Sequence, residues 1–206
     1  MSKNKNLLNK EQKQILLTVA KETIRSRLNN ETIPKFNFCD KIFAERRGAF
    51  VTVHKNGNLR GCIGYIEGIK PIIQTIKNMA ISAAFNDPRF PSLQKKEFPK
   101  LNIEISILTP LVKVNNVKNI EIGRDGLIIK QGFRQGLLLP QVATENNWNV
   151  DEFLQNTCLK AGLPLTAWKD SATDIKKFSA QVFDADVAEI LDMDEVRNRF
   201  SSHMRE

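Results

Sequence analysis

The segment Leu59-Arg60-Gly61-Cys62-Ile63-Gly64 combines the residue types in this chain that are best suited to chemistry. Glycine weakens a strand, so Gly61 and Gly64 beside a cysteine suggest the close approach of another backbone or of a ligand such as a substrate. Arg60 lies two residues before Cys62, and regular alternation places both side chains on one face of a sheet. A guanidinium so close would stabilise the thiolate, and Cys62 could then act as a nucleophile, a redox group or a single metal ligand.

Cys62 also has a simple structural interpretation. Unpaired cysteine is one of the residue types most often buried, and it packs as a small hydrophobic side chain. The local sequence leaves the functional and the structural interpretation open.

The dipeptide Asn56-Gly57 lies between two runs of strand-forming residues, Gly48–Lys55 and Leu59–Tyr65. Both residues of the tightest hairpin turn need a positive φ, so Asn-Gly between such runs is the strongest short-range signal of a β-hairpin. With this two-residue loop, regular pairing places Cys62 opposite Val51.

The same pairing decides whether a histidine can reach the thiol. With the two-residue loop, Arg60 lies opposite Val53, and His54 points to the face opposite Cys62. A three-residue loop would reverse this parity and bring His54 to the Cys62 side. Asn-Gly favours the shorter loop, so we expect no pair of Cys62 and His54. The other histidine, His203, lies near the end of the sequence.

A second segment with chemical potential is Asp87-Pro88-Arg89-Phe90-Pro91. Two prolines make it a rigid loop, in which we expect Asp87 to cap a turn. Arg89 could bind an anion, because a guanidinium offers planar, bidentate donors. A structural pair between Arg89 and a carboxylate is an equally good interpretation.

Charge is distributed unevenly along the 206 residues, which carry a formal net charge of +8. Residues 1–60 hold 13 Lys and Arg against 5 Asp and Glu, whereas residues 61–206 hold 18 of each. Nucleic acid or an acidic protein surface would contact this basic first third. Residues 184–206 carry 7 acids against 3 bases, and this segment could instead fold back onto the basic third.

Several classes of protein are excluded by what the sequence lacks. No apolar run approaches the roughly 18 residues of a membrane span, and the N-terminus has no apolar core of a secretory signal. The P-loop, G-x-G-x-x-G and G-x-S-x-G patterns are absent. We therefore expect a cytoplasmic protein without these nucleotide-binding or hydrolase motifs.

The cysteines and histidines argue against a metal centre. Cys39, Cys62 and Cys158 are an odd number at wide spacings, and with two histidines they form no usual zinc or iron–sulfur pattern. We expect reduced thiols and no metal site, and the sequence leaves the cofactor unknown. Cys158 lies among apolar residues of a predicted helix, where we expect it to be packed.

Periodicity predicts an α+β fold, because strands come in runs with helices between the groups. Helices are predicted over 10–28, 71–85 and 149–161, the last with Asn149 and Glu152 at the spacing of a capping box. Strands are predicted at 101–107, 120–122, 127–130, 136–139 and 178–183, and residues 137–142 read as a strand that runs into a proline. A short helix is possible within 184–206.

Seven short motifs follow one another along the chain: GAFVT (48–52), LRGCIG (59–64), DPRFP (87–91), ISILT (105–109), GRDGL (123–127), LLLPQV (137–142) and KAGLP (160–164). In this order they resemble the AMMECR domain family, whose prokaryotic members are often called AmmeMemoRadiSam system protein A. The resemblance covers residues 10–185 and leaves the acidic segment 186–206 outside.

The resemblance implies a two-lobed fold, with an antiparallel sheet flanked by helices in the larger lobe and a smaller second lobe. It also implies a cytoplasmic protein, often encoded beside a Memo-like protein and a radical-SAM protein, and hence shared work on a redox or metal-dependent modification. It supplies no established reaction. It does suggest that Cys62, Arg60 and the Asp87–Arg89 loop line one cleft.

Three classes of function remain open on the sequence. The chain is an enzyme, or an accessory subunit of one, in which Cys62 and Arg60 are catalytic and Gly61, Gly64, Asp87 and Arg89 contact substrate. It is alternatively a scaffold for the Memo-like and radical-SAM partners, or a nucleic-acid-binding protein that uses its basic first third. The oligomeric state is open in all three.

Overall fold

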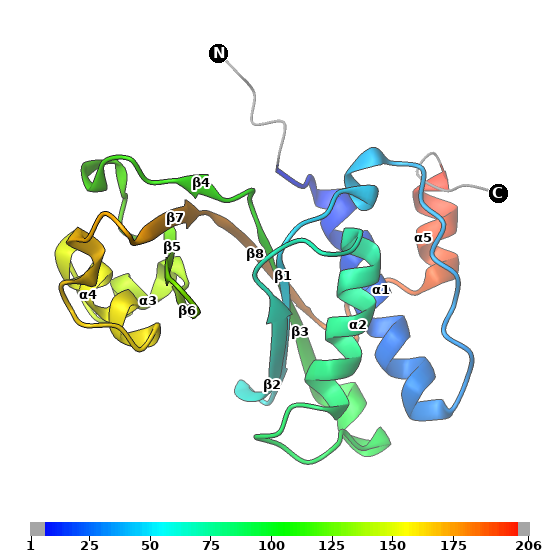
Figure 1. Ribbon diagram of the computed structural model, residues 1–206. Coiled ribbons are helices and arrows are strands. Elements are labelled where there is room, and N and C mark those ends of the chain that lie inside the picture. The colour runs from blue at the N-terminus through cyan, green and yellow to red at the C-terminus, as the bar shows by residue number, and fades with distance from the viewer. Residues whose placement is uncertain (1–6, 202–206) are drawn as a thin grey trace. The chain divides into compact units, whose positions relative to one another are not determined.

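The computed structural model describes residues 7–201, and the chain divides into two compact units. Unit 1 comprises the described residues up to Ile107 and those from Gln181 onward, and unit 2 comprises Leu108–Ala180. Each unit has its own four-stranded sheet and its own cluster of buried apolar residues. Figure 1 shows the helices and sheets of both units, which confirm the predicted α+β class and the division into a larger and a smaller lobe.

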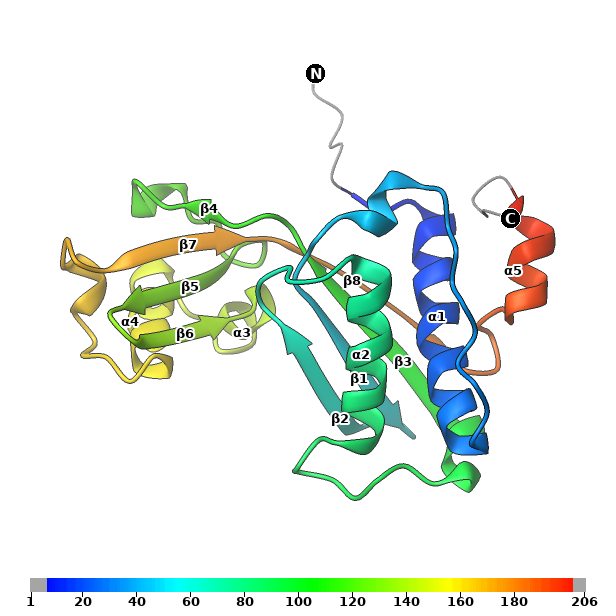
Figure 2. The ribbon, with the colours of Figure 1, turned by 45° about the vertical axis from the view of Figure 1, so that its right-hand side comes forward.

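Unit 1 packs its helices against one face of a sheet with the strand order β2-β1-β3-β8. Figures 1 and 2 show α1 and α2 on the same face. Its helices are α1 (Lys10–Asn29), α2 (Ile72–Phe85), α5 (Met193–Arg199) and the short 3-10 helices η1 (Lys41–Ala44) and η2 (Lys95–Lys100). Its strands are β1 (Ala49–Lys55), β2 (Asn58–Tyr65), β3 (Leu101–Leu108) and β8 (Ala180–Asp186).

Local sequence signals set the ends of α1. The Asn9 side chain accepts the backbone N–H of Gln12, and the Gln12 side chain accepts the N–H of Asn9, which is a capping box. Asn30 ends the helix with φ 58°, a left-handed conformation that asparagine tolerates. Between these ends, Ile15, Val19 and their neighbours are buried in the core of unit 1.

The hairpin of β1 and β2 has the predicted turn and an unpredicted bulge. Asn56 and Gly57 both have positive φ, and Lys55 pairs with Asn58. The pairing then shifts, so that Gly61 lies opposite Val53. Arg60 is therefore the extra residue of a β-bulge, and the predicted pairing of Arg60 with Val53 is wrong.

The bulge also changes the partner of the cysteine. Cys62 lies opposite Thr52, and not opposite Val51 as regular pairing predicted. Because strand side chains alternate, one extra residue moves every later side chain of β2 to the other face relative to β1. The face on which Cys62 lies is thus set by the bulge.

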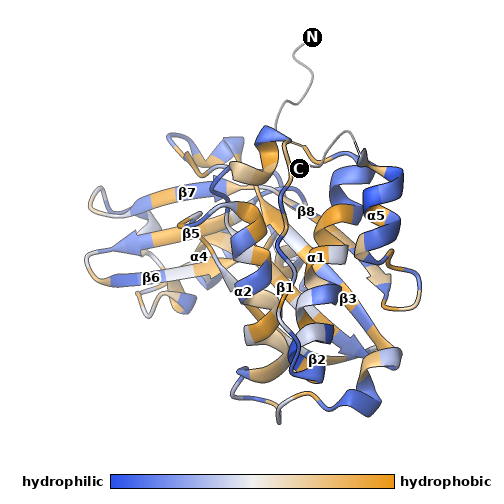
Figure 3. Cartoon of the chain, turned by 90° about the vertical axis from the view of Figure 1, so that its right-hand side faces the viewer, coloured by the Kyte–Doolittle hydropathy of each residue, from blue (hydrophilic) through white to orange (hydrophobic). Residues whose placement is uncertain are grey.

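Strand β3 has the predicted alternation. Leu101, Ile103 and Ile105 are buried in the core of unit 1, and the intervening Asn102 and Glu104 are half-buried on the other face. Figure 3 shows β3 changing between hydrophobic and hydrophilic colours along its length. One face of this sheet therefore packs under the helices, and the other carries polar side chains.

The acidic C-terminal segment packs on α1 of the same unit. Val196 and Met193 of α5 are buried in the core, although Figure 3 shows that the helix is mostly hydrophilic. Thr18 donates its hydroxyl to the carbonyl of Leu191 at 2.8 Å, and the ammonium of Lys21 donates to the carbonyl of Ile190 at 2.5 Å. This acidic segment thus folds back onto part of the basic first third. His203 lies outside the described residues.

Unit 2 is built on a sheet with the order β4-β7-β5-β6. Its core includes Phe153, Leu154 and Cys158 of α4, whose Asn149–Glu152 capping box forms as predicted. Its strands are β4 (Val112–Lys113), β5 (Gly126–Gln131), β6 (Arg134–Leu138) and β7 (Asp174–Phe178). Its helices are α3 (Pro140–Glu145), α4 (Val150–Lys160), η3 (Val117–Asn119) and η4 (Ala167–Lys169).

Two sequence predictions in this region are wrong. Residues 120–122 form no strand, because Asp125 closes a turn by accepting the backbone N–H of Glu121 and donating its own N–H to the Glu121 carbonyl. The strand predicted at 178–183 is two strands, β7 and β8. The strand predicted to run into a proline is β6, which ends at Leu138. Pro140 then begins α3, a helix that the sequence analysis did not predict, since its fixed φ and missing N–H suit the first turn of a helix.

Among the described residues, no helix has the length and apolar character needed to cross a membrane.

Candidate functional site

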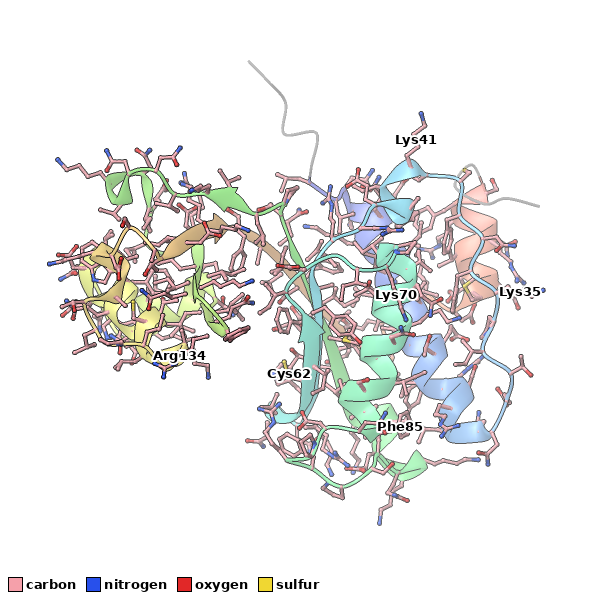
Figure 4. The ribbon with its side chains drawn as sticks, in the orientation of Figure 1. Lys35, Lys41, Cys62, Lys70, Phe85 and Arg134 are labelled. Carbon is pink, nitrogen blue, oxygen red and sulfur yellow. The ribbon has the colours of Figure 1, made fainter. Side chains whose placement is uncertain are left out.

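Cys62 lies half-buried on β2, on the side of the sheet away from α2. Its neighbour Gly61 faces the backbone of Ala83 in α2, and alternation then turns Cys62 the other way. Figure 4 shows the labelled Cys62 on that side of the strand. The Thr52 hydroxyl, directly across the hairpin, donates a hydrogen bond to the Cys62 sulfur at 3.1 Å.

Asp87 and Arg89 bind both backbone groups of Cys62. The Asp87 carboxylate accepts the N–H of Cys62 at 2.9 Å, and the Arg89 guanidinium donates to the Cys62 carbonyl at 3.1 Å. Since β2 is an edge strand, this N–H and this carbonyl have no neighbouring strand to pair with. The loop after α2 thus supplies the partners that a further strand would otherwise supply.

Asp87 and Arg89 also bind each other. Arg89 donates to Asp87 through its backbone N–H at 3.1 Å, through Nε at 2.9 Å and through Nη2 at 2.7 Å. The hydrogen bond from Arg89 is the largest influence on the pKa of Asp87 and holds it well below its usual range. Arg89 thus forms the structural pair with a carboxylate that was one interpretation of this loop. Its side chain is nevertheless 53% exposed, as the anion-binding interpretation requires.

The Arg89 guanidinium is held charged by its surroundings. Its hydrogen bond to Asp87 is the largest cause of a raised pKa, and its electrostatic interactions with Asp87 and Cys62 act in the same direction. The guanidinium that lies next to Cys62 is therefore that of Arg89, paired with Asp87, and not that of Arg60 as the sequence analysis expected.

Arg60 has a different position from the predicted one. Its guanidinium binds Glu97 of η2 through Nε and Nη2, each at 3.2 Å, and Lys55 binds the same carboxylate at 2.7 Å. Lys55 shares its strand face with the buried Val53, so Arg60 lies on the core side of the sheet and not with Cys62. The bulge at Arg60 is the reason, because it breaks the alternation on which the prediction rested.

Glu97 is a buried acid with two basic partners. Its side chain is 10% exposed, and the hydrogen bond from Arg60, followed by that from Lys55, lowers its pKa to about 2. Its second oxygen also accepts the backbone N–H of Gln94 at 3.0 Å. This cluster fixes η2 to the end of the hairpin.

Gly61 and Gly64 are required by packing. A Cβ on Gly61 would lie 2.0 Å from the Ala83 carbonyl oxygen, so α2 can approach β2 only at a glycine. A Cβ on Gly64 would lie 2.3 Å from the ring of Phe50. The close approach of another backbone is thus found at Gly61, and at Gly64 the Ala49 carbonyl oxygen, 2.5 Å from such a Cβ, adds to the Phe50 ring.

His54 lies on the same face of β1 as Thr52, and the bulge therefore places it on the Cys62 side, contrary to the predicted parity. Within residues 7–201, however, the hydrogen bond of the Cys62 sulfur is to Thr52, and none joins it to His54. The site brings together a thiol, a hydroxyl and a guanidinium without an imidazole bonded to the sulfur.

The sequence analysis missed Thr52 and Glu104. Thr52 pairs with Cys62 on one side and with Glu104 of β3 on the other, so thiol, hydroxyl and carboxylate form a row across three strands. Adjacent strands lie about 4.8 Å apart, so the backbones of Cys62 and Glu104 lie about 10 Å apart. The alternation of both strands was visible in the sequence, but their register was not.

The remaining thiols differ from Cys62. Cys158 is fully buried in unit 2, where burial raises the pKa of its thiol, whereas Cys62 is half-buried. Among residues 7–201 no group of three or more His, Cys, Asp or Glu side chains is arranged to hold a metal ion.

The chain is similar to proteins of archaea. It is 49% identical over 151 residues to a protein of Methanothermobacter thermautotrophicus, and the matched region covers 70% of this chain and 79% of that protein. It is 49% identical over 152 residues to a protein of Methanocaldococcus jannaschii, covering 70% and 76%.

A solved structure and a family model agree with these relatives. The crystal structure of the uncharacterised protein PH0010 from Pyrococcus horikoshii matches with a TM-score of 0.76 and 35% identity, covering 87% of this chain and 93% of that one. The model of the AMMECR1 family matches residues 17–183, which include the Cys62 hairpin and the Asp87–Arg89 loop. The chain therefore belongs to the AMMECR1 family.

Proposed function

We propose that this protein is an enzyme, or an accessory subunit of one, in which Cys62 is the reacting group. The observation that carries the proposal is that Asp87 and Arg89 bind the backbone N–H and carbonyl of Cys62. A side chain acts reproducibly only when its own backbone is held, and here two long-range hydrogen bonds hold it.

The thiol has a hydrogen-bond donor and a cation among its neighbours. The Thr52 hydroxyl donates a hydrogen bond to the sulfur. The Arg89 guanidinium binds the backbone carbonyl of the same residue. A thiol with such neighbours reacts with electrophilic carbon or with another sulfur, so Cys62 is suited to nucleophilic attack or to reversible thiol oxidation.

The proposal assigns distinct roles to the neighbouring residues. Cys62 is the catalytic residue, Thr52 and Arg89 contact it, and Asp87 is a positioning residue that acts through Arg89 and the Cys62 backbone. Arg60 has a structural role with Glu97. The partners proposed for the work are a Memo-like protein and a radical-SAM protein, which would supply the redox or metal-dependent part of the modification. The place of action proposed is the cytoplasm, where cysteine thiols stay reduced.

Thiol alkylation tests the proposal directly. Iodoacetamide labelling of the intact protein, followed by peptide mass spectrometry, gives the rates at Cys39, Cys62 and Cys158 in one experiment. Cys62 is expected to react at pH 7 at least about tenfold faster than the buried Cys158 and faster than a free cysteine peptide. If Cys62 stays as inert as Cys158 until the protein unfolds, the thiol is a packed side chain and the proposal is wrong.

A second function, a scaffold for the same partners, is supported by the 53% exposure of the Arg89 side chain beside the edge strand. Co-purification with the Memo-like protein distinguishes the two functions. A scaffold loses the complex when Arg89→Glu is introduced into a still-folded protein but keeps it in Cys62→Ser. An enzyme or its accessory subunit keeps the complex and loses the modification in Cys62→Ser.

A further inference from the structure

A groove in unit 1 lies between η1 and the start of α2, on the helix side of the sheet and separate from the Cys62 site. Its volume is about 380 Å³. We call it the Phe38 groove; its apolar lining consists of Phe36, Phe38, Phe43, Ala44, Pro71 and Ile73. The groove is of the size that accepts one or two apolar side chains of a partner.

The backbone around the groove is fixed. Asp40 begins η1 by accepting the backbone N–H of Ile42 at 3.1 Å, and it also accepts the Gln12 side chain of α1 at 2.6 Å. Ile72 donates its N–H to the Glu45 carbonyl at 2.9 Å, which joins η1 to the first turn of α2. The groove is therefore formed before any partner arrives, and a partner loses little energy to rearrangement.

Basic residues outnumber acidic ones around the groove. Lys41 and Asp40 line it, and Glu45, beside Ala44, is paired with Arg47. Four more cations lie next to lining residues: Lys35 beside Phe36, Lys70 beside Pro71, Arg46 in a backbone bridge to Pro71, and Lys77 at 5.7 Å from the Phe36 ring. Figure 4 labels Lys35, Lys41 and Lys70.

These five cations have no acidic partner among the residues that the structure describes. Three of them, Lys35, Lys41 and Arg46, belong to residues 1–60, where Arg25, Arg47, Lys55 and Arg60 each pair with a glutamate of the chain itself. Part of the unbalanced charge of the basic first third thus lies next to the Phe38 groove.

We propose that the Phe38 groove is a docking site for an acidic, amphipathic segment of a partner protein. Apolar side chains of the segment enter the groove, and its carboxylates face the surrounding lysines. This combination of an apolar anchor and a complementary charged rim is how grooves take helical or extended peptides. The proposal does not rest on the reactivity of Cys62.

The aromatic rings favour a peptide over nucleic acid. Single-stranded nucleic acid binds by stacking its bases on exposed ring faces. Here Phe38 and Phe43 are 9% and 3% exposed and pack against each other at 5.2 Å with their planes tilted by 50°. The Phe36 ring faces Lys77. The rings therefore form the wall of a groove and offer no platform to a base.

Peptide binding to the full chain tests this proposal. The probe is a fluorescein-labelled peptide of about 16 residues with the repeat Glu-Glu-Leu-Phe, compared with the same peptide in which Ser replaces Leu and Phe, and with a single-stranded oligonucleotide of equal charge. At about 50 mM salt the amphipathic peptide is expected to bind in the micromolar range and both comparison probes at least about tenfold more weakly. Equal binding of the Ser peptide, no binding of either peptide, or tighter binding of the oligonucleotide would overturn the proposal, the last in favour of a nucleic-acid surface.

Variants locate the binding. Lys41→Glu with Lys70→Glu is expected to weaken the amphipathic peptide at least about tenfold, whereas Lys113→Glu with Lys118→Glu, two exposed lysines of unit 2, leaves it unchanged. Ala44→Phe fills the groove from an exposed position and is expected to abolish binding without reversing a charge. Thermal melting checks that each variant is folded. Equal losses in the unit 2 control, or full binding by Ala44→Phe, would show that the peptide binds elsewhere.

Discussion

Asp87 accepts the backbone N–H of Cys62 at 2.9 Å across 25 residues of sequence. The carboxylate is buried and also accepts three hydrogen bonds from Arg89. The Arg89 guanidinium in turn donates a hydrogen bond to the Cys62 carbonyl. The backbone of one cysteine is thus held on both of its polar groups by one acid–base pair. Two hydrogen bonds of this kind join the loop after α2 to the edge of the sheet.

Replacing Asp87 by Asn is expected to destabilise the protein by about 2–4 kcal/mol. The amide has nearly the shape of the carboxylate but lacks its charge and turns a donor toward the Cys62 N–H or toward Arg89, which leaves a buried group unpaired. Urea unfolding at pH 7 measures the loss. Arg89→Lys, which keeps the charge but not the bidentate geometry, is expected to cost less. A variant Asp87→Asn as stable as the wild type would show that these bonds contribute nothing.

Gly61→Ala is expected to destabilise the protein by at least about 2 kcal/mol. The new Cβ would lie 2.0 Å from the backbone oxygen of Ala83, so α2 has to move away from β2. Gly57→Ala is the matched control, because its Cβ meets nothing within 4 Å and only the positive φ of 77° opposes it, at about 1 kcal/mol. Chemical denaturation measures the loss of unfolding free energy in each variant. A smaller loss for Gly61→Ala than for Gly57→Ala would contradict the packing argument.

The elements of this fold follow from local sequence signals far better than the site does. The capping boxes at Asn9 and Asn149 and the Asn56-Gly57 turn act within a few residues, so their helices and hairpin were predictable. The bulge at Arg60 was not, since the buried acid that binds Arg60 is Glu97, 37 residues later. That one residue decides which side chains share a face with Cys62.

The partners of Cys62 show the same limit. Asp87 and Arg89 were identified as chemically capable, and an Arg–carboxylate pair was among the interpretations of their loop. Their hydrogen bonds to the Cys62 backbone depend on the loop after α2 lying beside the edge strand β2. No local sequence pattern predicts that position. The Phe38 groove is also a product of tertiary packing, because Phe38 and Ile73 come from different elements.

Acid is expected to weaken the attachment of η2 to the hairpin through Glu97. Its folded pKa of about 2 lies below its ordinary value of 4.5, so its contribution to stability is complete above pH 4.5 and is lost as the pH falls toward 2. The difference corresponds to about 3 kcal/mol. Unfolding free energies of the wild type and Glu97→Gln between pH 6 and pH 3 should converge on acidification. A constant gap between the two curves would exclude Glu97 as the titrating group.

The pKa of Glu22 in α1 shifts in the opposite direction from that of Glu97. It is 1% exposed, and burial raises the pKa of its carboxyl, an effect that Arg25 and Lys21 oppose and that Asp192 and Asp194 reinforce. One carboxylate oxygen is buried without a hydrogen-bond partner among the described residues. A raised folded pKa means that the folded state binds the proton more tightly, so this group stabilises the fold below its ordinary value of 4.5 and loses that contribution as the pH rises.

Glu22→Gln is therefore expected to stabilise the protein at pH 7 by about 1 kcal/mol, because a neutral amide is cheaper to bury than an incompletely paired charge. Thermal melting at pH 7 and pH 5 tests this, with the gain expected to shrink at the lower pH. Glu31→Gln, an exposed acid just after the same helix, is the control for general charge effects. A loss of stability in Glu22→Gln would mean that the ion pair with Arg25 outweighs the burial.

Thr52 gives the sharpest test of the surroundings of the thiol. Its hydroxyl donates to the Cys62 sulfur at 3.1 Å, and Thr52→Val removes that donor while keeping the β-branched shape. The alkylation rate of Cys62 at pH 7 is expected to fall about three- to tenfold, since the thiolate loses a hydrogen bond worth about 1 kcal/mol. Thr52→Ser restores the hydroxyl and should restore most of the rate. If Thr52 only fills space, the order of the two labelling rates is reversed, because valine fills the site of threonine and serine does not. Slow labelling in Thr52→Ser with normal labelling in Thr52→Val would therefore refute the hydrogen-bond argument.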